Sequence, residues 1–96
     1  MLELRPVCEH CNKSLPPASA EAMICTFECT FCAECVEEVL ENVCPNCGGG
    51  FVPRPIRPKD ALQKYPPTAI ALHRPVDMDR LAKMQEKYEE IEPEDR

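Results

Sequence analysis

The chain has 96 residues and a formal net charge of −6, with a pI near 4.9. Proteins that bind DNA, RNA or anionic lipid gain most of their affinity by neutralising phosphate, so this acidic balance argues against all three. A chain this short buries only a thin core. It has no Trp and only 5% aromatic residues, but it has eight cysteines. We therefore expect bound metal or disulfide bonds to stabilise the fold.

The cysteine chemistry depends on the compartment. Residues 1–8 contain no apolar signal core, and no stretch approaches the roughly 18 apolar residues that a membrane span needs. We therefore expect a cytoplasmic protein with no membrane contact. Disulfides are rare in the cytoplasm, where cysteine clusters more often hold metal.

The first third of the chain predicts a knuckle, a loop and a hairpin. Residues 1–7 alternate loosely, which predicts a short strand or an extended lead-in. The C-x2-C pair over 8–11 suits a tight turn that directs two thiolates at one ion. The proline-containing stretch 12–21 has no helical period and predicts a polar loop. Apolar and β-branched residues over 22–31 then predict a β-hairpin.

A helix is predicted next, over residues 36–43. Its apolar residues recur at helical spacing and share one face: Val36, Val39, Leu40 and Val43. Glutamates occupy the opposite face and suit the positive end of the helix dipole. Asn42 can end the helix, and Pro45 cannot continue it. A second C-x2-C pair follows at once.

The composition changes after Gly50. Prolines recur over 53–58 too often for a helix or a central strand, which predicts an extended arm. Residues 60–65 predict one helical turn, and the weak alternation over 68–73 predicts a strand.

The last segment predicts a helix that begins after Asp77 or Asp79, either of which can cap it. Its apolar stripe consists of Leu81, Met84, Tyr88 and Ile91. We expect this stripe to pack on the domain or on a second copy of the chain. The helix is therefore a candidate surface for a homo-oligomer.

The eight cysteines fall into four pairs with two or three residues between partners: Cys8 and Cys11, Cys25 and Cys29, Cys32 and Cys35, Cys44 and Cys47. Tetrahedral zinc takes four ligands and prefers thiolate, so four pairs supply two complete sites. We predict two zinc ions in structural sites. Disulfides rank second. An iron–sulfur cluster ranks lower, because the ferredoxin spacings occur in reverse order.

The pairs can combine in chain order or interleave. We favour interleaving, because Cys29 and Cys32 are too close for two separate modules to fold side by side. The helix after Cys35 can also present two thiolates at its N-terminus. The predicted ligands are Cys8, Cys11, Cys32 and Cys35 in site 1, and Cys25, Cys29, Cys44 and Cys47 in site 2.

This spacing over 8–47 resembles the RING finger, including Phe31 before the fifth ligand and Pro45 inside the last pair. The fourth ligand, commonly His in RING domains, is Cys29 here, as in all-cysteine variants. The resemblance implies a small metal-stabilised α+β fold, a treble-clef zinc finger with a cross-brace. The predicted domains are a RING-like two-zinc domain over 1–52, a proline-rich arm over 53–76, and a C-terminal helix and tail over 77–96.

The whole chain is also similar to a family of short cysteine-rich bacterial proteins of unknown function. In that family a Leu-Glu-Leu-Arg-Pro start, eight cysteines and an Arg-Pro-Ile-Arg-Pro arm recur together. These elements stand here at Leu2–Pro6 and Arg54–Pro58. The likeness implies no particular activity.

We expect a non-catalytic zinc-binding module whose partner is another protein, and not an enzyme. A RING-type ubiquitin ligase is the first alternative. Three departures weaken it: Glu9 and His10 stand where ligases offer an aliphatic contact, the helix lacks a docking Trp, and Gly48 replaces a basic residue.

A nucleic-acid-binding regulator is the second alternative. It would use the basic residues near the arm, Arg54, Arg57, Lys59 and Arg74. We expect these side chains to be solvated or paired with acids instead. We expect His10 not to replace a thiolate, and His73 to lie on the surface. Neither histidine has a visible catalytic partner in the sequence.

Overall fold

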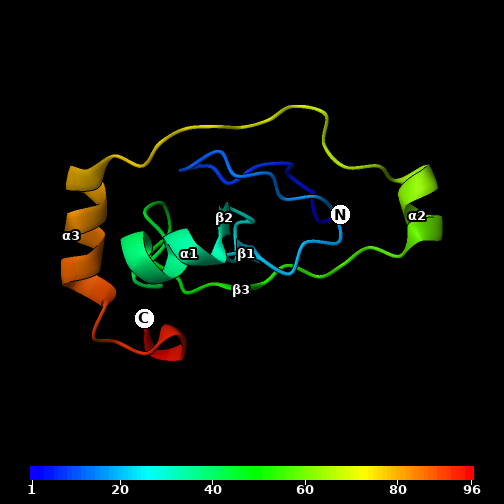
Figure 1. Ribbon diagram of the computed structural model, residues 1–96. Helices are drawn as coiled ribbons and strands as arrows, with labels where there is room; N and C mark the ends of the chain where they lie inside the picture. The colour runs from blue at the N-terminus through cyan, green and yellow to red at the C-terminus, as the bar shows by residue number, and fades with distance from the viewer.

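A computed structural model describes residues 1–96. Its centre is a three-stranded antiparallel sheet in the order β2-β1-β3 (Figure 1). The strands are β1 (Ala22–Ile24), β2 (Thr30–Cys32) and β3 (Val52–Pro53). Met23 lies opposite Phe31 on one side and Pro53 on the other. The predicted hairpin is confirmed, and the start of the proline arm adds a short edge strand to it, where a proline is tolerated.

The central helix starts earlier than expected. Helix α1 (Ala33–Cys35) continues directly into a π-helical turn, η1 (Val36–Leu40). The Cys32 sulfur accepts the backbone N–H of Cys35 at 3.4 Å and so caps the first turn. The predicted end at residue 43 is wrong, because Glu41 and Asn42 turn left-handed with φ of 52° and 59°.

The core and the cysteine clusters form one body. Six of the 13 residues in the main buried cluster are cysteines. The Phe31 and Phe51 rings meet edge to face, with centroids 5.6 Å apart. With so few large side chains available, much of the interior consists of sulfur, and its order depends on what holds the sulfurs together.

Beyond β3 the chain runs out to α2 (Lys59–Lys64) and back again, so that α2 and α3 (Met78–Tyr88) lie at opposite ends of a molecule 42 Å long (Figure 1). The predicted helical turn near residue 60 is confirmed. The predicted strand over 68–73 is wrong, because this segment has no neighbouring strand to pair with. One backbone hydrogen bond holds each end of it: the Thr68 N–H donates to the Leu4 carbonyl (3.0 Å), and the Arg74 N–H donates to the Glu9 carbonyl (2.8 Å).

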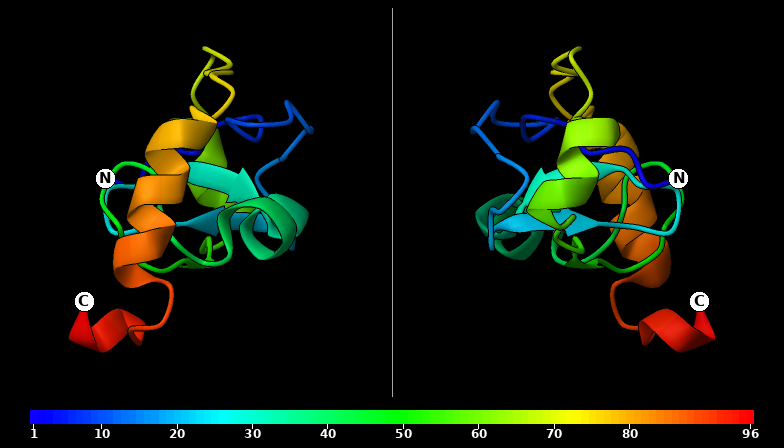
Figure 2. Two further views of the ribbon diagram at one scale, coloured as in Figure 1. Left: turned by 90° about the vertical axis from the view of Figure 1, so that its left-hand side faces the viewer. Right: turned by 90° about the vertical axis from the view of Figure 1, so that its right-hand side faces the viewer.

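Helix α3 is attached along the stripe that the sequence marks. Asp77 caps it by accepting the backbone N–H groups of Asp79 and Arg80. Leu81 is 1% exposed, whereas Ile91 lies past the helix end and is 39% exposed. Figure 2 shows α3 beside the sheet and the tail, which ends in the short turn η2 (Pro93–Asp95), below it. The stripe therefore packs on the chain's own domain through Leu81, with Met84 and Tyr88 half-buried and Ile91 left exposed.

None of the helices is long and apolar enough to cross a membrane.

Candidate metal centres

Four cysteine sulfurs meet in a first group, which we call cluster 1. The sulfurs of Cys8, Cys11, Cys32 and Cys35 all lie within 4.8 Å of one another. Two come from the first knuckle, and the other two stand on either side of α1's single turn, Cys32 as its cap and Cys35 as its last residue. The Cys11 and Cys32 sulfurs are 3.7 Å apart. A tetrahedral zinc–thiolate site has Zn–S bonds of ~2.3 Å and hence sulfurs about 3.8 Å apart, so this donor set fits such an ion.

Cluster 2 consists of the four remaining cysteines. The sulfurs of Cys25, Cys44 and Cys47 lie within 4.8 Å of one another. The Cys29 sulfur falls outside this group of three. It nevertheless lies 3.5 Å from the side-chain amide of Asn46, which stands between Cys44 and Cys47. Hydrogen bonding with Cys25 and then Cys44 lowers the pKa of the Cys29 thiol to about 2. The structure thus brings together a group of four and a group of three cysteines, and the assignment of Cys29 as the fourth ligand of the second group stays a prediction.

Backbone N–H groups point at the sulfurs. Besides the bond at Cys32, the turns of cluster 2 direct the N–H groups of Phe27, Asn46 and Gly49 at sulfurs two residues earlier, at 3.4 to 3.5 Å. The Asn46 side-chain amide also donates to the Cys29 sulfur at 3.5 Å. Such donors stabilise thiolate over thiol and orient metal ligands.

The thiols of a cluster cannot all ionise independently. Hydrogen bonding with Cys29 raises the pKa of Cys25 to about 11, and hydrogen bonding with Cys25 and Cys29 raises the pKa of Cys44. In cluster 1, burial raises the pKa of Cys35. Several thiolates held this close repel one another, and a bound cation removes that repulsion. Both groups could therefore hold a metal ion.

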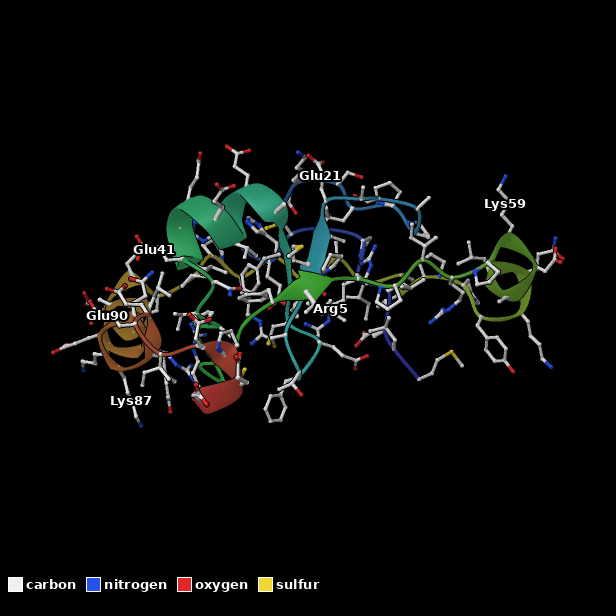
Figure 3. All side chains as sticks on the ribbon, turned by 90° about the horizontal axis from the view of Figure 1, so that it is seen from below. Arg5, Glu21, Glu41, Lys59, Lys87 and Glu90 are labelled. Atoms are coloured by element: carbon white, nitrogen blue, oxygen red, sulfur yellow. The ribbon has the colours of Figure 1, made fainter.

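Glu9, inside the first knuckle, is a buried carboxylate that supports the fold. It accepts from the Thr30 backbone N–H at 2.6 Å and pairs with Arg5 at 2.9 Å. Figure 3 shows Arg5 near the middle of the molecule, between its two ends. The sequence analysis missed the structural role of Glu9, because the Thr30 N–H that it accepts is 21 residues away. Its position between two cysteines is the only feature of the sequence that could have indicated this role.

The ring and the backbone of His10 form hydrogen bonds with the segment over 73–76. Its Nδ1 accepts the Val76 backbone N–H at 3.0 Å, and its carbonyl oxygen lies 3.1 Å from the His73 ring. His73 is exposed, as expected. The segment over 73–76 thus fastens to the first knuckle.

The end of the chain fastens to the second knuckle. A Cβ on Gly48 (φ +78°) would stand 2.5 Å from the Tyr88 ring, so α3 approaches this turn where only glycine fits. Arg96 donates to the carbonyls of Asn42 (2.8 Å) and Gly48 (3.1 Å). Gln85 donates to the last carbonyls of η1, those of Val39 and Leu40.

The expectation of a solvated or acid-paired basic group is wrong for Arg54 and Arg57. Arg54 is 4% exposed and donates to the carbonyls of Arg5, Leu15 and Pro16 at 2.8 to 3.2 Å. Arg57 donates to the carbonyl oxygens of Leu2 and Tyr65. These contacts span up to 55 residues, and no local pattern marks them.

The fold and the two cysteine clusters define a small α+β protein that could hold metal at two places. The sequence model of the family described as "Protein of unknown function (DUF1272)" matches residues 1–57, more than half of the chain, and the chain belongs to this family. An uncharacterized protein from Rhizobium meliloti (strain 1021) is 57% identical over 75 residues, which cover 78% of this chain and 89% of the relative.

No solved structure matches the chain. The likeness to a family of short cysteine-rich bacterial proteins of unknown function is confirmed. The RING-like classification, the domain boundaries and the identity of the metal stay predictions.

Proposed function

We propose that this protein is a zinc-stabilised, non-catalytic module that binds another protein, with two zinc ions in a RING-like cross-brace. The observation that carries the proposal is cluster 1, where four sulfurs from two distant segments converge within 4.8 Å. Cys25, Cys29, Cys44 and Cys47 hold the second ion. We place the module in the cytoplasm, where thiols remain reduced and available to metal.

Zinc is favoured by the donor set. Thiolates are soft ligands that select zinc, copper(I) or iron over magnesium and calcium. The 3.7 Å separation of Cys11 and Cys32 suits a shared ion and is far longer than the ~2.05 Å of a disulfide bond. Backbone donors to Cys25, Cys32, Cys44 and Cys47 supply the outer contacts that such ligands usually have.

A structural role is favoured over catalysis. A metal with four thiolate ligands has no free position for water or substrate. The two histidines bond to the backbone of each other's segments, and no nucleophile is paired with either of them.

The contacts also count against the two alternatives. In a RING-type ligase the knuckle around residues 9 and 10 faces the conjugating enzyme, but here the chain's own 73–76 segment is bonded to it. A nucleic-acid regulator would need the arm's arginines free for phosphate. Arg54 and Arg57 instead donate to backbone carbonyls within the fold.

Metal analysis combined with native and denaturing mass spectrometry tests the metal part of the proposal. We expect two zinc ions per chain in the native spectrum and eight reduced cysteines in the denatured one. One ion per chain, iron in place of zinc, or a mass lowered by two hydrogens per lost thiol pair would each contradict it.

The interaction part needs a separate test. The metal-loaded chain and a metal-free, thiol-alkylated chain are used as paired baits, and bound proteins are quantified by mass spectrometry. We expect at least one protein to be retained only by the metal-loaded bait. Identical recoveries from the two baits would show that the folded module presents no specific surface.

A further inference from the structure

One cavity, of about 730 Å³, opens beside cluster 2. It is lined by the hairpin tip, by the second knuckle and by residues 72–80, which lead into the first turn of α3. Its walls include Phe27, Asn46, Cys47, Leu72, Arg74 and Arg80. Ligand-binding cavities commonly have volumes of about 300–1,000 Å³, so this one has room for a few residues of a peptide but not for a folded domain.

The charges in the cavity are unevenly matched. The Glu9 carboxylate is held by Arg5 and the Thr30 N–H, and Asp77 caps α3. Arg5 also lies 3.6 Å from the Glu3 carboxylate, so it has two acidic partners. Both acids and one arginine are therefore engaged within the protein.

Arg74 and Arg80 are the two cations left over. Both line the cavity, and neither guanidinium forms a hydrogen bond or an ion pair within the chain. The chain carries 17 acidic residues against 11 basic ones, so two unpaired arginines in one cavity stand out from its general charge. A planar guanidinium recognises a carboxylate through two parallel hydrogen bonds.

The rim of the cavity carries an exposed aromatic ring. Phe27 is 70% exposed, although its backbone N–H is fixed to the Cys25 sulfur at 3.4 Å. Leu72 and Val76 add apolar surface to the lining. Aromatic residues and arginines are the side chains that most often dominate binding energy at protein interfaces.

We propose that this cavity binds an acidic peptide segment of the partner protein. Its carboxylates pair with Arg74 and Arg80, and a neighbouring apolar side chain packs against Phe27 and Leu72. The inference rests on the proposed interaction function and names its surface. Because the rest of this acidic chain repels such a segment, the two arginines also orient the partner as it approaches.

A random heptapeptide library displayed on phage, selected on the full chain with its bound metal, tests the proposal. We expect enriched peptides to carry Asp or Glu next to a large apolar residue. In fluorescence polarisation, Arg80→Ala and Arg74→Ala should each weaken the best peptide by about tenfold, and higher salt should weaken it further. Phe27→Ala should weaken it through loss of apolar contact.

Lys59→Ala is the matched control, because Lys59 is an exposed cation on α2 with no ion pair, at the far end of the molecule (Figure 3). It should bind the peptide like the parent chain. Enriched peptides without acids, no enrichment at all, or full binding by Arg80→Ala would overturn the proposal. If the module then still retains a partner and two zinc ions, the proposed function survives and only this surface is wrong.

Discussion

The two halves of the molecule are held by different kinds of contact. Of its 21 buried residues, only Arg54 and Leu81 lie beyond Val52. The first half has a sulfur-rich core and two clusters that could hold metal. The second half follows the surface of the first and is held by single anchors, among them Gln85 and Arg96. The first half thus depends on its clusters as a whole, and the second on individual side chains.

The largest effect is expected where a cluster loses a ligand. Cys35→Ser should unfold the half of the domain around cluster 1, because structural zinc contributes on the order of 10 kcal/mol, about the whole stability of a small domain. Circular dichroism and a metal count measure this. Glu34→Gln, at the exposed neighbouring position, is the control. An unchanged melting curve for Cys35→Ser would refute the metal account of this half.

Removing the buried anchor of α3 should have a smaller effect. Leu81→Ala is expected to cost about 2–5 kcal/mol of unfolding free energy, because the side chain is 1% exposed and leaves a cavity. Met78→Ala on the same helix, 55% exposed, should change it by about 0.5 kcal/mol or less. Urea denaturation compares the two. Both variants should keep two zinc ions, and loss of metal from Leu81→Ala would erase the contrast between the halves.

Arg54 joins the two halves. Arg54→Ala should lower the free energy of unfolding by about 2 kcal/mol, because it leaves three carbonyls with one donor fewer, of which Pro16 alone keeps a backbone donor, the Ser19 N–H. Arg54→Lys should recover only part of the loss, since an ammonium cannot reproduce the planar fork. Thermal melts of the three proteins decide this, and full recovery by lysine would mean that charge alone matters.

The smallest effect concerns the contact between α3 and the second knuckle. Gly48→Ala should cost about 1–2 kcal/mol through left-handed strain and overlap with Tyr88. A double-mutant cycle with Tyr88→Ala separates the two causes. We expect the combined loss to be smaller than the sum of the single losses, because the overlap disappears with the ring. Strict additivity would argue that α3 does not approach this turn.

The sequence predicted the local features well. The hairpin over 22–31 and the Asp77 cap follow from nearby residues, whose spacing and chemistry act within a few positions. Cluster 1 was predictable for a related reason, because paired thiolates have few uses other than binding metal together.

The failures lie where distant parts of the chain meet. The segment over 68–73 alternates like a strand, but no neighbouring strand is available to pair with it. The sequence predicts a surface position for Arg54, but its guanidinium is buried and donates to backbone carbonyls 38 to 49 residues away.

X-ray absorption at the zinc edge of the purified chain tests the central claim most directly, because it reports which atoms surround the metal. The account predicts a single shell of four sulfurs at about 2.3 Å, with two zinc ions per chain. A shell containing nitrogen or oxygen, as would arise if water took the place of the Cys29 sulfur, would contradict two closed four-sulfur sites.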